Sequence, residues 1–423
     1  MVRNRSRELY ERARRLMPGG VSSPVRAYAP YPSYIQRGKG ARMYDVDGNE
    51  FIDYCMAFGP LILGHAHPAV VKAVREQVES GTLYGAPVEA EIELAELVGR
   101  HFPSMEMMRF VNSGTEATMH AIRLARGATG RKLIVKMEGA FHGAHDGVLV
   151  KAGSGATTHS SPNSAGVLEE VAANTLLAPF NDIEAVERKL ALNKGKVAAV
   201  ILEPVIGNVG PVLPDDGYLA QLREVTRKND VLLIFDEVIT GFRLAMGGAQ
   251  SRFGVEADIT TLGKVLGGGL PIGAFGASAE IMENVSPLGK VYQAGTFSGN
   301  PLSMAAGIAA LKELERIGHE DLERKGADMR SKLGEVVRDN RLDYHVSGLG
   351  SMFQLFMTGR PVRNYQDALT SDATNFMRLF HALLERGVYI PPSQFETCFL
   401  STAHSDEDIR RTVDAYDDAL GAP

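Results

Sequence analysis

The sequence predicts an α/β fold, with a large domain on a mostly parallel β-sheet and a smaller α+β domain. Three observations carry this prediction. Apolar, strand-like runs alternate with amphipathic helical segments through the middle of the chain, which is typical of a parallel sheet covered by helices on both faces. Two of these runs lead directly into chemically active side chains, Asp236 and Lys264. Both ends of the chain mix short strands with helices, which indicates a separate α+β unit.

The composition is that of an ordinary globular protein. The 423 residues are 44% hydrophobic and 23% charged, with a formal net charge of −6. This balance gives no electrostatic reason to bind nucleic acid or an anionic membrane, and no apolar run approaches the length of a membrane span. The two cysteines, Cys55 and Cys398, lie far apart and in no metal or redox spacing. We therefore expect a reducing compartment, and by default the cytoplasm.

A chain of this length predicts two or three domains. The change from mixed elements to regular alternation, and back again, divides it into an N-terminal segment of the small domain (1–62), the large α/β domain (63–320) and a C-terminal α+β segment (321–423). The small domain would thus be built from both chain ends.

Turn residues set the limits of the first elements. Pro18-Gly-Gly20 ends an initial charged helix, and Pro24 should keep the segment up to Arg26 extended. Asp47-Gly48 marks a hairpin turn. The elements expected in this region are helices over 5–17, 68–79 and 88–102 and a small antiparallel ribbon that includes a strand over 51–54.

The alternating pattern covers the next two hundred residues. Expected strands are 108–111, 132–136, 197–202, 231–235 and 258–262, and expected helices are 115–126, 218–228, 304–316 and 319–339. The last hundred residues return to short strands (353–357, 388–390, 399–401) and helices (372–386, 406–420). One stretch, Lys151–Gly166, is rich in Gly, Ser and Thr. A loop of that length inside a compact protein is usually either disordered or a functional lid.

Lys264 lies between a strand-like run and the glycine cluster Gly267-Gly-Gly269. The default interpretation of any lysine is a surface charge. The alternative is an amine held at a strand end for chemistry, and Asp236 favours it, because an acid at the end of a buried strand marks an α/β active site. Asp236 could otherwise be a cap or an ion-pair partner, whereas a carboxylate there could keep a pyridine nitrogen protonated. We infer that Lys264 and Asp236 hold the two ends of one cofactor. The adjacent Glu237 should point the other way.

The motif Asn112-Ser-Gly-Thr-Glu-Ala117 follows a strand and opens a helix. Ser113 can cap that helix, and Glu116 can complete a capping box. The same helix start could also bind an anion such as phosphate through its free N–H groups. It is not a P-loop, because no lysine follows it.

Histidines and one arginine offer further candidates. His142 and His145, like His65 and His67, lack the spacing and third ligand of a metal site, so we predict no metal. Arg26 could be a solvated arginine or a guanidinium that grips a substrate carboxylate in a bidentate fork.

Taken together, the motifs resemble the class III aminotransferases of the fold-type I, pyridoxal-phosphate-dependent family, over nearly the whole chain. The matching stretches are Gly19-Gly-Val-Ser-Ser-Pro-Val-Arg26, Leu63-Gly-His-Ala-His-Pro68, Asn112-Ser-Gly-Thr-Glu-Ala117, Glu203-Pro-Val-Ile-Gly-Asn208, Phe235-Asp-Glu-Val-Ile-Thr-Gly-Phe-Arg243, Thr261-Leu-Gly-Lys264, Gln293-Ala-Gly-Thr-Phe-Ser-Gly-Asn-Pro301, Gly350-Ser-Met-Phe353 and Pro392-Ser-Gln-Phe-Glu396. The aspartate-then-lysine pair is specific for the superfamily, and the first and last motifs point to its aminomutase branch.

The resemblance implies a role for each candidate residue. Lys264 would form the Schiff base with the cofactor and then shuttle protons, and Asp236 would pair with the pyridine nitrogen. The implied phosphate ligands are Ser113, Gly114, Thr115 and, from the neighbouring subunit of a homodimer, Thr296. Phe141 would stack on the ring, with Asn208 and Glu203 beside it. The implied substrate ligands are Arg26 for a carboxylate, Glu396 at the amino-group end, and Ser164 in the Lys151–Gly166 stretch, which would be a gating loop.

The implied reaction is a pyridoxal-phosphate-dependent transfer of an amino group within one small amino-aldehyde, in tetrapyrrole biosynthesis. Ala57, Phe58, Val88 and Phe141 depart from the residues usual in the family and lie near the expected substrate pocket. A transaminase that uses an external keto acceptor, or a racemase, is therefore the alternative. A non-catalytic protein with a relict cofactor site is disfavoured by the intact Lys264 and Asp236.

Overall fold

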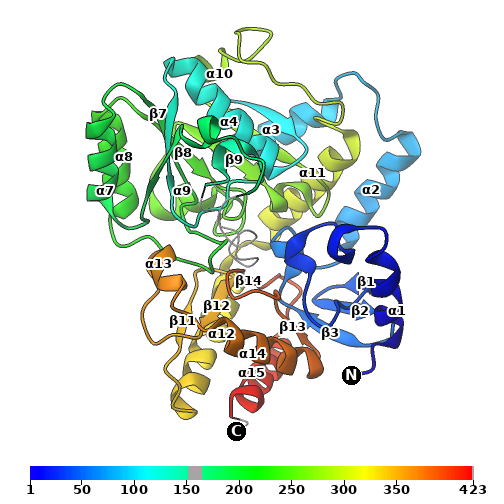
Figure 1. Cartoon of the computed structure of the whole chain (residues 1–423). Coiled ribbons are helices and arrows are strands. Elements are labelled where there is room, and N and C mark those ends of the chain that lie inside the picture. The colour runs from blue at the N-terminus through cyan, green and yellow to red at the C-terminus, as the bar shows by residue number, and fades with distance from the viewer. Residues whose placement is uncertain (151–163, 422–423) are drawn as a thin grey trace.

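A seven-stranded sheet lies at the centre of the large domain, in the order β4-β10-β9-β8-β7-β5-β6 (Figure 1). The computed structural model describes residues 1–150 and 164–421. The strands are β4 (Met107–Val111), β5 (Leu133–Met137), β6 (Thr175–Ala178), β7 (Val197–Leu202), β8 (Leu232–Asp236), β9 (Ile259–Gly263) and β10 (Gly273–Ala277). Neighbours from β9 to β6 pair in parallel, and β10 runs antiparallel to both β9 and β4. The mostly parallel sheet is thus confirmed, whereas β6 and β10 were not predicted.

The sheet is buried on both faces because its strands alternate between two apolar cores. Along β7, Val200 packs in one core and Ala199 in the other. Along β8, Leu233 and Ile234 divide in the same way. Helices α7 (Ile183–Leu192) and α8 (Tyr218–Lys228) contribute to the first core, and α4 (Gly114–Thr129) contributes to the second. This packing explains why these strands read as continuous apolar runs.

The remaining helices of the large domain pack at the β4 side of the sheet. α2 (Pro68–Ser80) lies beside α11 (Pro301–Ile317), and α3 (Glu89–His101) also contacts α11 (Figure 1). Leu94, Leu97, Leu311 and Leu314 supply part of their shared core. Short helices complete the domain: α6 (Glu169–Ala172), α9 (Gly248–Phe253) and α10 (Ala279–Met282).

The two ends of the chain meet in one small sheet. β1 (Ile35–Lys39), β2 (Arg42–Asp45) and β3 (Glu50–Asp53) form the predicted antiparallel ribbon, and β13 (Val388–Tyr389) adds to β3 in parallel. A separate antiparallel sheet consists of β11 (His345–Ser347), β12 (Met352–Phe356) and β14 (Cys398–Phe399). The helices here are α1 (Asn4–Ala13), α12 (Glu320–Asp339), α13 (Tyr365–Ala368), α14 (Ala373–Glu385) and α15 (Asp406–Gly421).

One apolar core joins residues from both ends. It contains Phe51 and Tyr54 from the N-terminal segment and Phe380 and Leu383 from α14. The grouping agrees with a small domain made of both chain ends, and the boundaries at 62/63 and 320/321 stay a prediction.

Two local expectations were wrong. Pro24–Arg26 form a 3₁₀ turn, not an extended segment, because proline also fits the first position of a helical turn. The capping box at α4 is only half formed. Ser113 Oγ accepts from the amide of Glu116 at 3.1 Å, but the Glu116 carboxylate accepts instead from the backbone amide of Asn112 at 2.9 Å.

Within the described residues, no helix combines the length and apolar character that crossing a membrane requires. Most of the predicted Lys151–Gly166 loop, residues 151–163, lies outside the described residues.

Candidate active site

Five parallel strands deliver polar or aromatic residues to one edge of the central sheet. The residues at or just beyond the carboxyl ends of β4, β5, β7, β8 and β9 are Ser113, Phe141, Glu203, Asp236 and Lys264. All five line one cavity of about 520 Å³, together with Arg26, Ala57, Gly114, Thr115 and Asn208. A cleft outside the carboxyl ends of the strands is the expected place for a ligand in an α/β sheet.

Lys264 extends into this cavity from the first residue after β9. Its backbone adopts a positive φ of 45°, which is uncommon for a residue with a side chain. Its ammonium donates to the carbonyl oxygen of Phe58 at 2.6 Å. Removal from bulk water lowers the pKa of Lys264, while the carboxylates of Glu396 and Glu203 partly oppose that shift. A lysine in such a place reaches its neutral, nucleophilic form more readily than one on the surface.

Asp236 lines the same cavity and is almost fully buried. One carboxylate oxygen accepts from the hydroxyl of Thr261 at 3.0 Å and from the amide of Val238 at 3.1 Å. The other lies 2.7 Å from Nδ1 of His142. These partners fix the carboxylate at the end of β8, where it can receive a proton-bearing ring nitrogen.

The neighbouring Glu237 points away from the cavity, as predicted. Its carboxylate accepts from the amides of Ala249 and Gln250 at 2.7 and 2.9 Å, and from the hydroxyl of Thr240 at 2.7 Å. Burial raises its pKa despite these bonds. Two adjacent acids therefore differ in kind: Asp236 faces the cavity, and Glu237 anchors the start of α9.

The start of helix α4 forms a third wall. Ser113, Gly114 and Thr115 line the cavity, and the first amide groups of a helix have no acceptor within the helix. Gly143 packs directly against this turn at φ +91°, where an added Cβ would lie 2.6 Å from the Cα of Thr115. Only glycine fits there, and it lets the backbone after Phe141 lie close to the helix start. The wall suits a phosphate group.

Phe141, Glu203 and Asn208 form one connected unit. The buried Glu203 carboxylate accepts from the amide of Phe141 at 3.0 Å, the amide of Gly207 at 3.0 Å and the side-chain amide of Asn208 at 2.9 Å. Desolvation raises the pKa of Glu203. Glu203 therefore sets the positions of an aromatic side chain and an amide at the cavity wall.

Arg26 is exposed and lines the cavity, where it is placed to meet an anionic group that enters. Of the four residues that depart from the family, Ala57 and Phe141 also line the cavity. Phe58 is connected to the cavity by its backbone carbonyl, which accepts a hydrogen bond from Lys264. Val88 lies at the start of α3, where its amide donates to Glu91, and is not part of the cavity wall.

Three predicted site residues are not part of the cavity wall. Ser164 is exposed at the edge of the described residues, and its hydroxyl donates to the carbonyl of Ala165. Thr296 is exposed between the large exposed side chains of Tyr292 and Phe297. Glu396 is buried and acts on Lys264 through its charge, raising the pKa that burial lowers.

The histidine motif has a structural explanation. His142 pairs with Asp236, and His65 lies 2.7 Å from Asp53. Burial lowers the pKa of His145 to about 4. In the described part of the chain, no group of three His, Cys, Asp or Glu side chains is arranged to hold a metal ion. The contact between His142 and Asp236 was not predicted from the sequence. The position of His142, directly after the proposed ring-stacking Phe141, could have indicated it.

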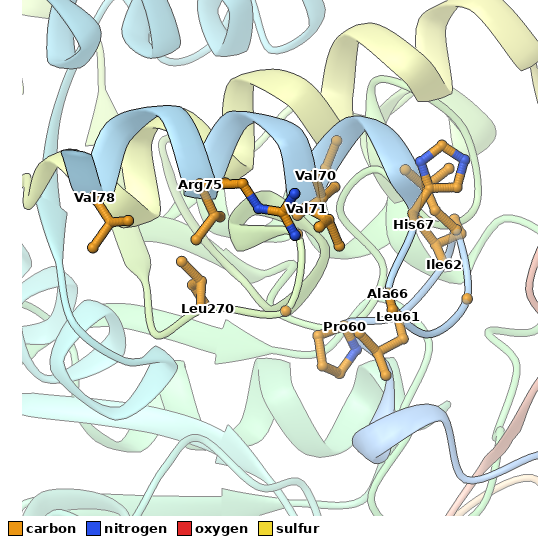
Figure 2. A pocket seen from close by; sticks show the side chains of 16 residues that line it. Pro60, Leu61, Ile62, Ala66, His67, Val70, Val71, Arg75, Val78 and Leu270 are labelled. Atoms are coloured by element: carbon orange, nitrogen blue, oxygen red, sulfur yellow. The ribbon is translucent and has the colours of Figure 1, made fainter. Parts of the chain in front are cut away.

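A second, apolar pocket of about 510 Å³ adjoins the first, and the two share Pro60, Gly269 and Leu270. Figure 2 shows Val71 and Val78 pointing from α2 toward Leu270 across this pocket. Val71 and Val78 are themselves exposed. An exposed apolar pocket of this kind is typical of a site that contacts a ligand, a membrane or another protein.

Comparisons with known proteins agree with this geometry. The model of the class III aminotransferase family matches residues 25–420. The chain is 58% identical to the glutamate-1-semialdehyde 2,1-aminomutase of Methanothrix thermoacetophila, over 98% of this chain and 96% of that protein. A solved ω-transaminase from Sphaerobacter thermophilus superposes with a TM-score of 0.92 at 37% identity, covering 98% of this chain and 97% of that one. A glutamate-1-semialdehyde aminomutase from Pseudomonas aeruginosa, solved in complex with PMP, superposes with a TM-score of 0.88 at 28% identity, covering 99% and 94%. The chain belongs to the class III aminotransferase family, with the fold-type I architecture that the sequence predicted.

Proposed function

We propose that the chain is a pyridoxal-phosphate-dependent aminomutase that converts glutamate-1-semialdehyde into 5-aminolevulinate, a step of tetrapyrrole biosynthesis. The observation that carries this proposal is the single cavity that Lys264 and Asp236 line together from the ends of β9 and β8. The 58% identity to a protein named for this reaction, over almost the whole chain, supports the choice of substrate.

The cavity walls fit the cofactor in three places. Asp236 would hold the pyridine nitrogen, Phe141 would cover the ring, and the start of α4 at Ser113, Gly114 and Thr115 would take the phosphate. When bound, pyridoxal phosphate and its pyridoxamine form store an amino group and withdraw electrons from the substrate carbon. Asn208, held by Glu203, would fix the tilt of the ring from its side.

The chain's own residues supply position and proton transfer. Arg26 would grip the substrate carboxylate at the entrance and so set which carbon faces Lys264. Nζ of Lys264, once neutral, would take a proton from one substrate carbon and return it at the neighbouring one. The partly buried position of Lys264 would limit the exchange of that proton with bulk water. We propose Glu396 and Ser164 as further contacts at the substrate end.

A homodimer would complete the site. The apolar pocket between α2 and Leu270 adjoins the catalytic cavity, and a second copy is the occupant that we propose for it. Thr296, exposed between Tyr292 and Phe297, would reach the phosphate of that second copy. The cytoplasm remains the predicted location, supported by the two buried cysteines, which are unpaired.

Mixed subunits test the shared site. We would combine Lys264→Ala and Thr296→Val chains under conditions that exchange subunits. If Thr296 serves the partner, each mixed dimer contains one intact site, and tight cofactor binding returns in about half of the sites of the mixed dimers. Recovery no better than that of the separate variants would mean that Thr296 acts in its own chain or not at all. Light scattering that gives a monomer would contradict the dimer itself.

The reaction is tested with one substrate alone. Cofactor-loaded protein incubated with glutamate-1-semialdehyde, without any second amino or keto compound, should form 5-aminolevulinate, and Lys264→Ala should not. Absence of product from protein that holds the cofactor would overturn the proposal.

A transaminase with an external keto acceptor is the second candidate. It is favoured by the solved ω-transaminase, which is more similar to the chain than the solved aminomutase is, and by Ala57 at the cavity wall. Turnover that requires an amino donor together with a separate keto acid, and no conversion of glutamate-1-semialdehyde alone, would establish it.

A further inference from the structure

The segment from Met56 to Gly59 has an unusual backbone. Its four residues have φ values of 45°, 55°, 65° and 122°, and only the last is a glycine. A positive φ is an uncommon, strained conformation for a residue other than glycine, and it persists only where the surroundings impose it. Something must therefore hold this segment in place beside the catalytic cavity.

Two adjacent carbonyls of this segment bind two cations. The carbonyl of Phe58 accepts from Nζ of Lys264 at 2.6 Å, and the carbonyl of Gly59 accepts from Nη2 of Arg243. Gly59 also packs tightly against the lysine: a Cβ added there would lie 3.2 Å from Cδ of Lys264 and 3.5 Å from the ring of Phe399. Lys264, Gly59 and Arg243 thus form one continuous contact.

Arg243 is only 1% exposed, and no carboxylate among the described residues pairs with it. Its Nη1 donates to the hydroxyl of Ser351 at 2.9 Å and to the carbonyl of Leu400 at 3.3 Å. Its guanidinium carbon lies 4.7 Å from the ring centre of Phe399. A buried charge without a counter-ion is unfavourable for stability. An apolar side chain could not bind the carbonyls of Gly59 and Leu400, so it is the guanidinium that holds these two segments together.

We propose that Arg243 is a positioning residue for Lys264, because it ties the Met56–Gly59 segment to Ser351 and Leu400 and so fixes the Phe58 carbonyl that holds the lysine. The same loop that begins at Asp236 supplies Arg243, seven residues later. The inference rests on the proposed function, since it assigns Arg243 to the site in which Lys264 acts.

The charge of Arg243 also affects the pKa of Lys264. The charged groups that act on the lysine are Glu396, Glu203 and Asp236, which raise its pKa, and Arg243, which lowers it. Removal of the guanidinium should therefore raise the pH at which Lys264 becomes neutral. It should also free the Phe58 carbonyl, so that Nζ loses its fixed direction.

Arg243→Met is the test, with Arg330→Met as the matched control. Arg330 likewise donates to two backbone carbonyls, those of Gly350 and Met352, but it lies on α12 and not beside Lys264. The first measurement uses apoprotein without substrate. Pyridoxal phosphate is added across a range of pH, attachment is trapped with borohydride, and the mass increase is read.

We expect the half-point of attachment to move up by about one pH unit in Arg243→Met and to stay in place in Arg330→Met. The kcat of the loaded Arg243→Met protein should fall about 10²-fold, with KM little changed because Arg26 is intact. An unchanged half-point together with a kcat within about twofold of the wild type, in folded Arg243→Met protein, would overturn the positioning role.

Two milder variants keep the proposal testable if Arg243→Met does not fold. Ser351→Ala removes one acceptor of Arg243 without touching Gly59, and Arg243→Lys keeps the charge but not the fork. Both should lower kcat several-fold and leave the half-point within about 0.3 pH units. Wild-type kcat in both would overturn the inference. Failure of the wild type itself to attach the cofactor would instead overturn the proposed function.

Discussion

Two buried lysines of the same sheet differ in a way that separates function from packing. Lys136 in β5 is fully buried, and burial lowers its pKa to about 7. Burial likewise lowers the pKa of Lys264 after β9. Lys136 donates to three carbonyls, those of Ala140, Val148 and Val150, at 2.8, 3.1 and 3.3 Å. Among the described residues, Lys264 has one hydrogen-bond acceptor, Phe58, and it opens onto a cavity.

The comparison teaches that a shifted pKa does not identify a catalytic lysine. An ammonium has three donors, and Lys136 uses all three to fasten the backbone after β5. Lys264 keeps donor capacity for a ligand and lines a cavity together with a carboxylate, that of Asp236. Unused hydrogen-bonding capacity at a cavity wall is the better criterion.

The largest expected effect is that of Lys264→Ala. Without Nζ the chain can neither attach the cofactor nor move the substrate proton, so kcat should fall by about 10³-fold or more. The folded state should survive, because the ammonium makes one hydrogen bond to the described residues, to the carbonyl of Phe58. Formation of 5-aminolevulinate and thermal unfolding, measured on the same sample, check both parts. Substantial remaining turnover would remove the distinction between the two lysines.

The neighbouring acids give the next contrast. Asp236→Asn should weaken cofactor affinity and lower kcat by about 10²-fold, because an amide does not stabilise a protonated pyridine as a carboxylate does. Glu237→Gln should instead lower the melting temperature, because Glu237 anchors α9, and leave cofactor affinity within about twofold of the wild type. Cofactor titration followed by absorbance and a thermal melt distinguish the two. Equal loss of cofactor in both variants would contradict the assignment.

Arg26→Met should have a smaller effect, confined to substrate binding. The loss of a charge-assisted pair at an exposed site should raise KM by about 10-fold while kcat falls less. Steady-state kinetics with glutamate-1-semialdehyde measure both constants, and Arg37→Met, which removes an arginine that stacks on Tyr44 in the ribbon, is the control. A fall in kcat with KM unchanged would place Arg26 outside substrate recognition.

Lys136→Met should change how stability depends on pH, in addition to removing the three hydrogen bonds that Lys136 donates. The folded-state pKa of Lys136, about 7, lies below the ordinary lysine value of 10.5. Between these values the unfolded chain holds a proton that the folded chain does not, so this lysine makes stability rise with pH across that window. The variant should lack that rise, and the exposed Lys132→Met should keep it. Urea unfolding at pH 7, 8 and 9 tests this, and parallel curves for wild type and Lys136→Met would contradict it.

Much of the sheet could be predicted because its strands are apolar and bounded by helical segments. β10 was missed for a physical reason. Its sequence, Gly-Ala-Phe-Gly-Ala, has little β propensity, yet it fits because its two glycines, Gly273 and Gly276, lie too close to neighbouring backbone for a larger residue. An added Cβ at Gly273 would lie 2.2 Å from the carbonyl oxygen of Ser113. Close packing of this kind depends on the partner strands and is not visible in one segment.

The cofactor end of the site was also predictable, since Asp236, Lys264 and Ser113 follow strands whose ends must meet at one edge. The substrate end was not, because Arg26 and Ala57 reach the cavity on turns near the N-terminus, far in sequence from the strands that form the cofactor end. Arg243 ends the motif that begins at Phe235 and contains Asp236, but nothing in the sequence indicates that it binds the carbonyl of Gly59. That contact joins segments 184 positions apart.

The parallel pairing of β3 with β13 places Ile52 against Val388. During synthesis, the first ribbon leaves the ribosome with one edge unpaired, and its partner strand follows more than three hundred residues later. The large domain can assemble its sheet in the meantime, whereas the ribbon must wait for nearly the whole chain. The Met56–Gly59 segment follows β3 directly, so the carbonyl partner of the lysine adjoins a strand whose pairing is completed only when the last part of the protein has been made. We therefore expect this part of the site to be among the last features to mature.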